Sequence, residues 1–242
     1  MRHLDDLREF EDCVEMQRIV WGEEITVPSP VFVVAKHTGG QVLGAFESGR
    51  MVGFTLALAG VHEAGSFLHS HMTAVLPELQ NRGVGRLLKL AQRDDALARS
   101  INLVEWTFDP LELRNAHFNL TRLGAIGRKF IPNCYGITES PLHAGLPTDR
   151  LVAEWHLASK RVSEIIAGAS PRPGASAVRI AVPTDLSDWK QKDRARALRV
   201  QSEVREQFER WFAQGYVATA LERTGPIANY VLEPPASHAA WE

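Results

Sequence analysis

A short glycine-containing segment, placed between an apolar strand and a helix, restricts the fold of this chain more than any other feature. Gln80-Asn81-Arg82-Gly83-Val84-Gly85-Arg86 follows an apolar stretch that ends at Val75. Glycines in such a turn let the main chain approach a ligand closely, and their N–H groups can converge on phosphate oxygens. The helix that follows adds the positive end of its dipole. The segment therefore predicts an anion site, to which Arg82 and Arg86 add side-chain charge.

Two other glycine loops that bind phosphate do not fit this sequence. A nucleotide P-loop needs a Lys-Ser/Thr pair after its last glycine, and Gly85 is followed by Arg86-Leu87. The dinucleotide fingerprint needs glycine or alanine where this chain has Leu88. An ordinary helix N-terminus without a ligand remains the alternative.

The periodicity of apolar residues around the loop predicts alternating strands and helices. A loop with Pro28 and Pro30 should follow the first helix, and Val84, Leu87, Leu88 and Ala91 should form the buried stripe of the helix after the glycines. The expected helices lie at about 8–21, after the glycine loop and at about 112–123, and the expected strands at 41–48, 51–60, 66–75, 102–108 and 151–157.

A stretch of small residues and prolines at 167–177 suggests a boundary. Beyond it we expect a strand at 178–182, a helix at about 188–213 and strands at 217–222 and 229–232. The chain is thus expected to have a first domain, 1–165, and a β-α-β-β extension, 178–242, that packs onto it. The fold class is α/β, in the α+β sense of a mixed central sheet flanked by helices.

Charge and cysteine content exclude several classes of function. The formal net charge of −2 gives no field that would attract nucleic acid or an anionic membrane. The two cysteines, Cys13 and Cys134, form no metal or disulfide pattern. The most apolar run, 51–61, is shorter than the roughly 20 residues that span a bilayer. We therefore expect a cytoplasmic protein without membrane or nucleic-acid partners.

The run from Val75 to Gly85 resembles the acyl-CoA-binding motif of the GNAT superfamily of N-acetyltransferases, and the order of elements over about residues 5–158 is similar to that family. The resemblance implies a mixed central sheet and acetyl-CoA, or another acyl-CoA, as co-substrate. Main-chain groups at Met72–Val75 would hold the pantetheine arm, and amides from Arg82 to Arg86 the pyrophosphate. The cofactor-binding residues expected on this basis are Met72, Thr73, Ala74, Val75, Gln80, Asn81, Arg82, Gly83, Val84, Gly85, Arg86, Asn115, Phe118 and Asn119.

Two histidines precede the loop in His69-Ser70-His71. Strand alternation predicts that His69, His71, Thr73 and Val75 share one face. The pair stands where arylalkylamine N-acetyltransferases of the superfamily carry a His-x-His pair that helps to deprotonate the amine. Imidazole suits that task because it titrates near neutral pH. The alternatives are hydrogen-bonded core histidines and, with further ligands that the sequence does not identify, a zinc site.

The segment from Asp109 to Gly124 resembles the GNAT helix that carries an asparagine and a tyrosine, but Leu113 and Leu120 stand at those two positions. The family's usual proton donor to CoA thiolate is therefore missing. The general acid is then absent, replaced by water or supplied elsewhere. Tyr135 is our candidate for the last case, with ordinary packing as its alternative. Asn115 and Asn119 lie four residues apart and either bind the CoA arm or cap local backbone.

Two charged residues are candidates for binding the acceptor. Glu105 lies within an apolar strand, where it orients a histidine or a substrate amine, or pairs with an arginine. Arg150 either binds a substrate carboxylate or forms a loop ion pair with Asp149.

The whole chain resembles a GNAT group with a C-terminal extension, some of whose members are associated with N-acylation of amino acids. This resemblance implies direct transfer of an acetyl, or a succinyl, group to a small-molecule amine or an amino acid, without a metal. A homodimer is expected for a soluble enzyme of this size. The alternative, which the missing tyrosine keeps open, is a protein that binds acyl-CoA as a sensor or scaffold without turnover.

Overall fold

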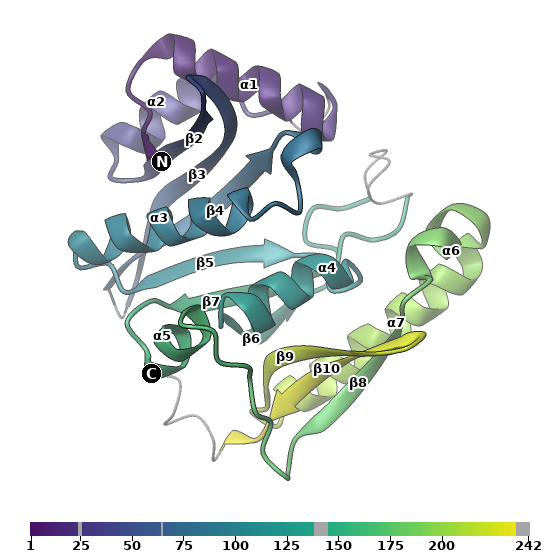
Figure 1. The fold of residues 1–242 in the computed structure, drawn as a ribbon. Coiled ribbons are helices and arrows are strands. Elements are labelled where there is room, and N and C mark those ends of the chain that lie inside the picture. The colour runs from purple at the N-terminus through teal and green to yellow at the C-terminus, as the bar shows by residue number, and fades with distance from the viewer. Residues whose placement is uncertain (24–25, 64, 138–144, 236–242) are drawn as a thin grey trace. The chain divides into compact units, whose positions relative to one another are not determined.

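The computed structural model describes residues 1–23, 26–63, 65–137 and 145–235 (Figure 1). The chain forms two compact units, Met1–Glu105 and Trp106–Glu242, and the division lies within one strand. Each unit is described by itself.

The first unit is a sheet with helices on both faces. Its strands follow the order β1-β2-β3-β4-β5, in which neighbours are antiparallel except for the parallel pair β4–β5. Its elements are β1 (Arg2–His3), α1 (Leu7–Trp21), α2 (Ser29–His37), β2 (Gln41–Glu47), β3 (Arg50–His62), β4 (Gly65–Val75), the 3₁₀ turn η2 (Pro77–Leu79), α3 (Val84–Ala98) and β5 (Leu103–Phe108).

Local sequence signals set the ends of the N-terminal helices. The side chain of Asp6 accepts a hydrogen bond from the N–H of Glu9 and caps α1, and Gly22 ends this helix with a φ of 86°. Helix α2 lies where the two prolines predicted a loop. Pro28 is its N-cap residue and Pro30 lies in its first turn, where a helix does not need the missing N–H.

Strands β2 and β3 form the predicted hairpin. Ser48 and Gly49 both have positive φ, 49° and 83°, as the tight turns that fit the right-handed twist of the strands require.

Neighbouring residues of β3 face different helices. The ring of Phe54 lies 5.7 Å from that of Phe32 in α2, whereas a Cβ on Gly53 would come within 3.1 Å of Leu88 in α3. Helices α1 and α2 therefore cover one face of the sheet and α3 the other. The predicted stripe of α3 is correct for Leu88, but Leu87 is exposed.

The second unit contains a sheet with the strand order β7-β6-β9-β10-β8. Its elements are α4 (Leu113–Ala116), the π-helical turn η3 (His117–Arg122), β6 (Ile126–Ile131), β7 (Arg150–His156), α5 (Lys160–Ile166), β8 (Val178–Pro183), α6 (Leu186–Lys192), α7 (Arg194–Phe212), β9 (Val217–Thr224) and β10 (Ile227–Glu233).

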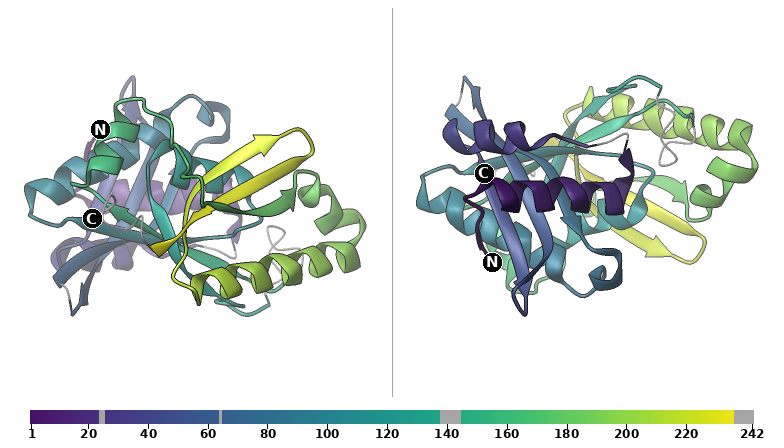
Figure 2. Two further views of the ribbon diagram at one scale, coloured as in Figure 1. Left: turned by 90° about the horizontal axis from the view of Figure 1, so that it is seen from below. Right: turned by 90° about the horizontal axis from the view of Figure 1, so that it is seen from above.

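The C-terminal extension continues this sheet. Gly127 of β6 pairs with Ala218 of β9, and α7 lies along the strands (Figure 2). The predicted strands are present, but the predicted single helix is two, because the side chain of Asp193 caps a new helix at the N–H of Arg196. Both predicted parts, 1–165 and 178–242, thus contribute to the second unit, and the division of the chain into a domain and an extension stays a prediction.

A buried lysine attaches α6 to the turn after β5. Lys190 Nζ lies 3.1 Å from Asp109 Oδ2 and 3.2 Å from Glu112 Oε1. Burial opposes the charge of this lysine, but the two carboxylates outweigh it and raise its pKa. The hydroxyl of Tyr230 donates to Pro110 O at 2.5 Å, so β10 is fastened to the same turn.

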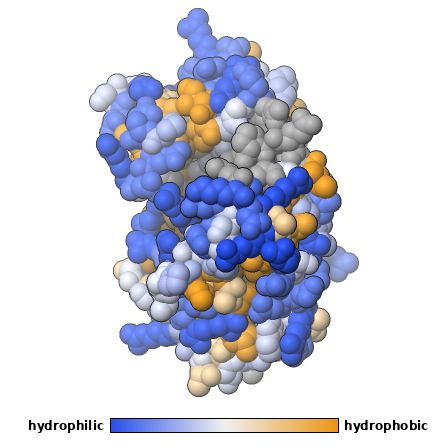
Figure 3. Space-filling model, turned by 90° about the vertical axis from the view of Figure 1, so that its right-hand side faces the viewer, coloured by the Kyte–Doolittle hydropathy of each residue, from blue (hydrophilic) through white to orange (hydrophobic). Residues whose placement is uncertain are grey.

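On the face shown in Figure 3, hydrophobic side chains form several separate groups among hydrophilic ones. Exposed apolar residues of this kind are normal on folded proteins.

Candidate active site

The strand that carries the two histidines is interrupted at His71. Leu56 of β3 pairs with Met72 and the next residue, Ala57, pairs with Ser70, so that His71 is an extra residue without a partner in β3. This arrangement is a β-bulge, which bends a strand and changes the direction of its side chains.

Both imidazoles lie on one face of β4. The rings of His69 and His71 lie with their centroids 6.2 Å apart. His69 pairs with Leu58, which packs in the cluster of α1 and α2, so the pair lies on that side of the sheet.

The predicted placement of Thr73 and Val75 beside the histidines is wrong. Val75 packs, as Val84 of α3 does, against the cluster that contains Leu88, on the opposite face of the sheet. The hydroxyl of Thr73 lies 2.9 Å from that of Thr55, and Thr55 shares the α3 face with Gly53. Strand alternation failed here because the bulge at His71 shifts it by one residue.

Burial makes both histidines neutral near physiological pH. It lowers the pKa of His69, which the charges of His71 and Lys89 lower further, and it alone lowers the pKa of His71. A neutral imidazole can accept a proton, so the pair has the protonation state of a general base.

Glu105 and His62 extend this polar face. Glu105 lies opposite His69 in the short parallel ladder of β4 and β5. Its Oε2 lies 3.2 Å from His62 Nε2, so its partner is a histidine and not the arginine considered above. His62, whose ring stacks on Phe67 at 3.9 Å, was missed in the sequence, because only strand pairing brings it here.

Beyond the histidines, one edge of β4 has no strand partner among the described residues. The ladder with β5 comprises Leu68–Val104 and His69–Glu105 and does not continue along Ser70–Val75. An unpaired strand edge offers main-chain N–H and C=O groups to an extended ligand. The predicted residues Met72, Thr73, Ala74 and Val75 lie on this edge.

The open edge leads into the glycine loop. Gln80 Nε2 donates to Val75 O at 3.0 Å and ties the loop to the end of β4. Asn81 and Gly83 have positive φ, 60° and 88°, and Gly83 caps α3 without a side-chain hydrogen bond. The first N–H groups of α3 therefore lack a side-chain acceptor at the cap, as an anion site needs.

The loop has room for a phosphate group. A Cβ on Gly83 would meet nothing within 4 Å, and one on Gly85 would meet only Val75 Cγ2 at 3.9 Å. Arg82 is exposed beside these glycines. The residues present thus fit the pyrophosphate of a CoA molecule.

Two predicted residues, Tyr135 and Arg150, meet in the second unit. The Tyr135 hydroxyl lies 2.9 Å from Thr107 Oγ1, and the guanidinium of Arg150 lies 5.3 Å from the centre of the Tyr135 ring. Arg150 Nη1 also donates to Asp149 O at 2.9 Å. Tyr135 is 58% exposed, so its ring is not an ordinary core residue.

Comparison with known proteins finds no family model that matches this chain. No curated protein matches its sequence either.

Solved structures do match its fold. It is similar to the ribosomal-protein-S18-alanine N-acetyltransferase of Escherichia coli, with 15% identity, 64% of this chain and 91% of that chain covered, and a TM-score of 0.52. It is also similar to an acetyltransferase of the GNAT family from Streptococcus pneumoniae. The identity is 14%, the match covers 63% of this chain and 95% of that chain, and the TM-score is 0.50. The chain has the GNAT fold. A third similar structure is that of the yncA protein of Salmonella typhimurium, solved with its cofactor acetyl-CoA. The identity is 15%, the match covers 72% of this chain and 96% of that chain, and the TM-score is 0.51.

The predicted resemblance to the GNAT superfamily is thus confirmed in the fold, including the mixed sheet flanked by helices. The matches cover about two thirds of this chain and nearly all of the other chains. The site residues remain predictions at this level of identity.

The turn that carries Leu120, where the resemblance implied a tyrosine, is π-helical. The N–H of Leu123 donates to Phe118 O, five residues back, and Leu120 is fully buried. Asn119 is 1% exposed, and its Nδ2 has no hydrogen-bond partner among the described residues. Asn115 is exposed and Phe118 half-buried. Their roles toward CoA stay predictions.

The described part of the chain contains no group of three His, Cys, Asp or Glu side chains that could hold a metal ion. Nor does it contain a helix both long and apolar enough to cross a membrane.

Proposed function

We propose that this protein is an acyl-CoA-dependent N-acyltransferase that transfers an acetyl or succinyl group to the amine of a small molecule, such as an amino acid. The observation that carries the proposal is the continuity of three features of the first unit. The His69–His71 pair, the unpaired edge of β4 and the Asn81–Gly83 turn follow one another within 15 residues.

Acyl-CoA would bind along this edge of β4. Amides of the first turn of α3 would hold the pyrophosphate, with Arg82 and Arg86 beside it. The unpaired main chain at Met72–Val75 would bind the pantetheine arm. A main-chain N–H of that strand would stabilise the oxyanion that forms at the thioester carbonyl.

His71 would then act as the base. An ammonium group cannot attack a thioester, and the lowered pKa of His71 leaves its imidazole free to take the proton from the amine. His69 supports the same step. Attack forms the C–N bond, the C–S bond breaks, and the thiolate of CoA leaves and takes up a proton. Tyr135 is the proposed donor of that proton.

Glu105 and Arg150 are the proposed acceptor-binding residues. The Glu105 carboxylate lies opposite His69, where it could orient an amine. Arg150, stacked beside Tyr135, has the charge to bind the carboxylate of an amino acid. A cytoplasmic location and a homodimer remain predictions.

A donor–acceptor screen tests the proposal. Acetyl-CoA and succinyl-CoA are each incubated with free amino acids and small amines, and release of CoA thiol is followed. Amine-dependent release supports the transferase. The burial of Leu120 at the usual tyrosine position favours one other function, a non-catalytic acyl-CoA-binding protein. Tight CoA binding without release in any arm would support that function instead.

A further inference from the structure

A lysine lies buried directly beneath the histidine strand. Lys89 of α3 and Ser70 of β4 are each 5% exposed. Lys89 Nζ donates to Ser70 Oγ at 2.6 Å and to Gln92 Oε1 at 3.0 Å. Ser70 Oγ and Gln92 Oε1 are neutral oxygens. Burying an amine in this way costs free energy that an apolar side chain such as methionine would not cost.

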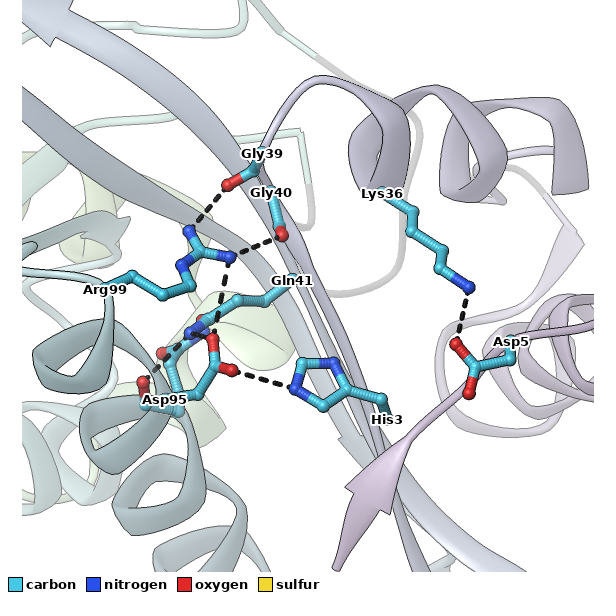
Figure 4. Close-up of polar contacts among 9 residues, drawn as sticks. His3, Asp5, Lys36, Gly39, Gly40, Gln41, Asp95 and Arg99 are labelled. Carbon is cyan, nitrogen blue, oxygen red and sulfur yellow. Dashed lines mark hydrogen bonds and ion pairs between the residues drawn. The ribbon is translucent and has the colours of Figure 1, made fainter.

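The lysine belongs to a polar chain that runs to the surface of the first unit. Gln92 O accepts from Gln41 Nε2 at 3.1 Å, and the same nitrogen donates to Asp95 Oδ2 at 2.5 Å. Asp95 Oδ1 lies 2.8 Å from His3 Nε2. Figure 4 shows the outer part of this chain, with Gln41 and His3 converging on Asp95. α3 is thereby tied to β1 and β2 as well as to β4.

The contact with Ser70 lies at the point where β4 changes register. Ser70 is the paired residue that immediately precedes the unpaired His71. Its side chain points to α3, whereas His69 and His71 lie on the other face. A bond that fixes Ser70 from below therefore fixes the main chain from which both imidazoles project.

We propose that Lys89 is a positioning residue for the His69–His71 pair, acting through its hydrogen bond to Ser70 from the opposite face of β4. It holds the main chain at the bulge, and with it the positions from which both imidazoles project. The inference rests on the proposed function, in which this pair accepts the proton of the amine.

The charge of Lys89 provides a second link to His69, which can be measured as a change in the pKa of that histidine. Burial lowers the pKa of Lys89 to about 7, so it gains a proton in the same range as a histidine. That charge is one of the causes that lower the pKa of His69, after burial and the charge of His71. The other titratable groups on the surrounding elements are Arg2 and His3 of β1, Glu47 of β2, Arg50 and His62 of β3, Arg86, Arg93, Asp94 and Asp95 of α3, and Glu105 of β5.

Two variants separate the bond from the charge. Ser70→Ala removes the hydrogen bond and keeps the lysine, whereas Lys89→Met removes both. Lys36→Met, which changes an exposed lysine of α2 in the same unit, is the matched control. The measurements are kcat, KM for acyl-CoA, and the pKa of His69 from an NMR titration of the imidazole carbons, assigned with His69→Asn.

We expect both Ser70→Ala and Lys89→Met to lower kcat on the order of tenfold, with KM for acyl-CoA within about twofold of the wild type. Lys89→Met should also raise the pKa of His69, because it removes a neighbouring positive charge, and Ser70→Ala should leave it unchanged. A lysine with a purely structural role would lower the stability of the fold, but its loss would not lower kcat at a constant KM or raise the pKa of His69.

Wild-type kcat in folded Ser70→Ala, or an unchanged His69 pKa in Lys89→Met, would overturn the inference. If Lys89→Met does not fold, Ser70→Ala decides. If the wild type transfers no acyl group to any amine, the proposed function fails, and the His69 titration in Lys89→Met still decides the link between the two residues.

Discussion

Arg205 and Asp149 form a two-point ion pair within the second unit, with Arg205 Nε 3.0 Å from Oδ2 and Nη2 2.8 Å from Oδ1. The Asp149 side chain is fully buried, and its Oδ1 also accepts from the N–H of Asn133 at 2.9 Å. One turn earlier on α7, Gln201 Nε2 donates to Pro147 O at 2.6 Å. The extension thus supports the segment that leads into Arg150.

Replacing Arg205 by methionine should destabilise the second unit. Among the described residues it leaves the buried Asp149 carboxylate with the main-chain N–H of Asn133, and breaking one side of a buried pair costs about 3 kcal/mol. Urea unfolding of Arg205→Met measures the loss. Arg199→Met, an exposed change on the same helix, is the control and should cost less than about 0.5 kcal/mol. Equal stability of both variants would show that the pair does not brace the segment.

Local signals predicted much of the fold. Gly22 marked the end of α1, and the apolar alternation gave β2 to β4 with ends correct to within two residues. Helix α2 was missed because Pro28 and Pro30 are read as loop residues, although a first turn accepts proline.

The site was harder to predict, since its geometry depends on pairing between strands. No sequence pattern marks the bulge at His71, which reversed the expected faces of Thr73 and Val75. Lys89 did leave a signal, because it occupies the same helix face as Leu88 and Gln92 and is polar there. The pairing of Arg205 with Asp149 joins residues that are 56 positions apart, and it leaves no signal in the sequence.

Alanine at Gly85 should weaken acyl-CoA binding without harming the fold. A Cβ there meets only Val75 Cγ2 at 3.9 Å, and alanine is favoured over glycine in a helix by about 1 kcal/mol. In the complex the same Cβ would stand where the pyrophosphate approaches the main chain. We expect Gly85→Ala to bind CoA on the order of tenfold more weakly by calorimetry, which corresponds to about 1.4 kcal/mol.

Gly83→Ala provides the contrast. Gly83 has a φ of 88°, so alanine strains the loop even without a ligand and should lower thermal stability by roughly 1–2 kcal/mol. Wild-type CoA affinity in a stable Gly85→Ala variant would place the pyrophosphate elsewhere.

The acid limb of the pH–rate profile should report the histidine pair. The pKa values of His69 and His71 both lie below the ordinary 6.5, so the base is active at neutral pH and is lost as the pH falls through those lowered values. His71→Ala should reduce kcat on the order of 10²-fold or more, with KM for acyl-CoA nearly unchanged. Turnover that stays at the wild-type level in His71→Ala at saturating substrate would reject His71 as the base.

Stability should rise with pH because of Lys89. Its pKa of about 7 in the folded chain lies below the ordinary 10.5, so between these values the unfolded chain holds a proton that the folded chain lacks. At about 1.4 kcal/mol per pH unit, the free energy of unfolding of the wild type relative to Lys89→Met should increase on the order of 3 kcal/mol from about pH 7 to about pH 9.5. A constant difference over this range would mean that Lys89 stays protonated in the folded chain.

The stoichiometry of a single reaction tests the central claim most directly. Wild-type protein is incubated with the best acyl-CoA and amine from the screen, and the CoA thiol and the N-acylated amine are quantified together by mass spectrometry. Transfer within a ternary complex predicts equal amounts of both, and a greatly reduced rate in His71→Ala. Bound acyl-CoA that yields neither product, or thiol formed without an N-acylated amine, would contradict acyl transfer by this protein.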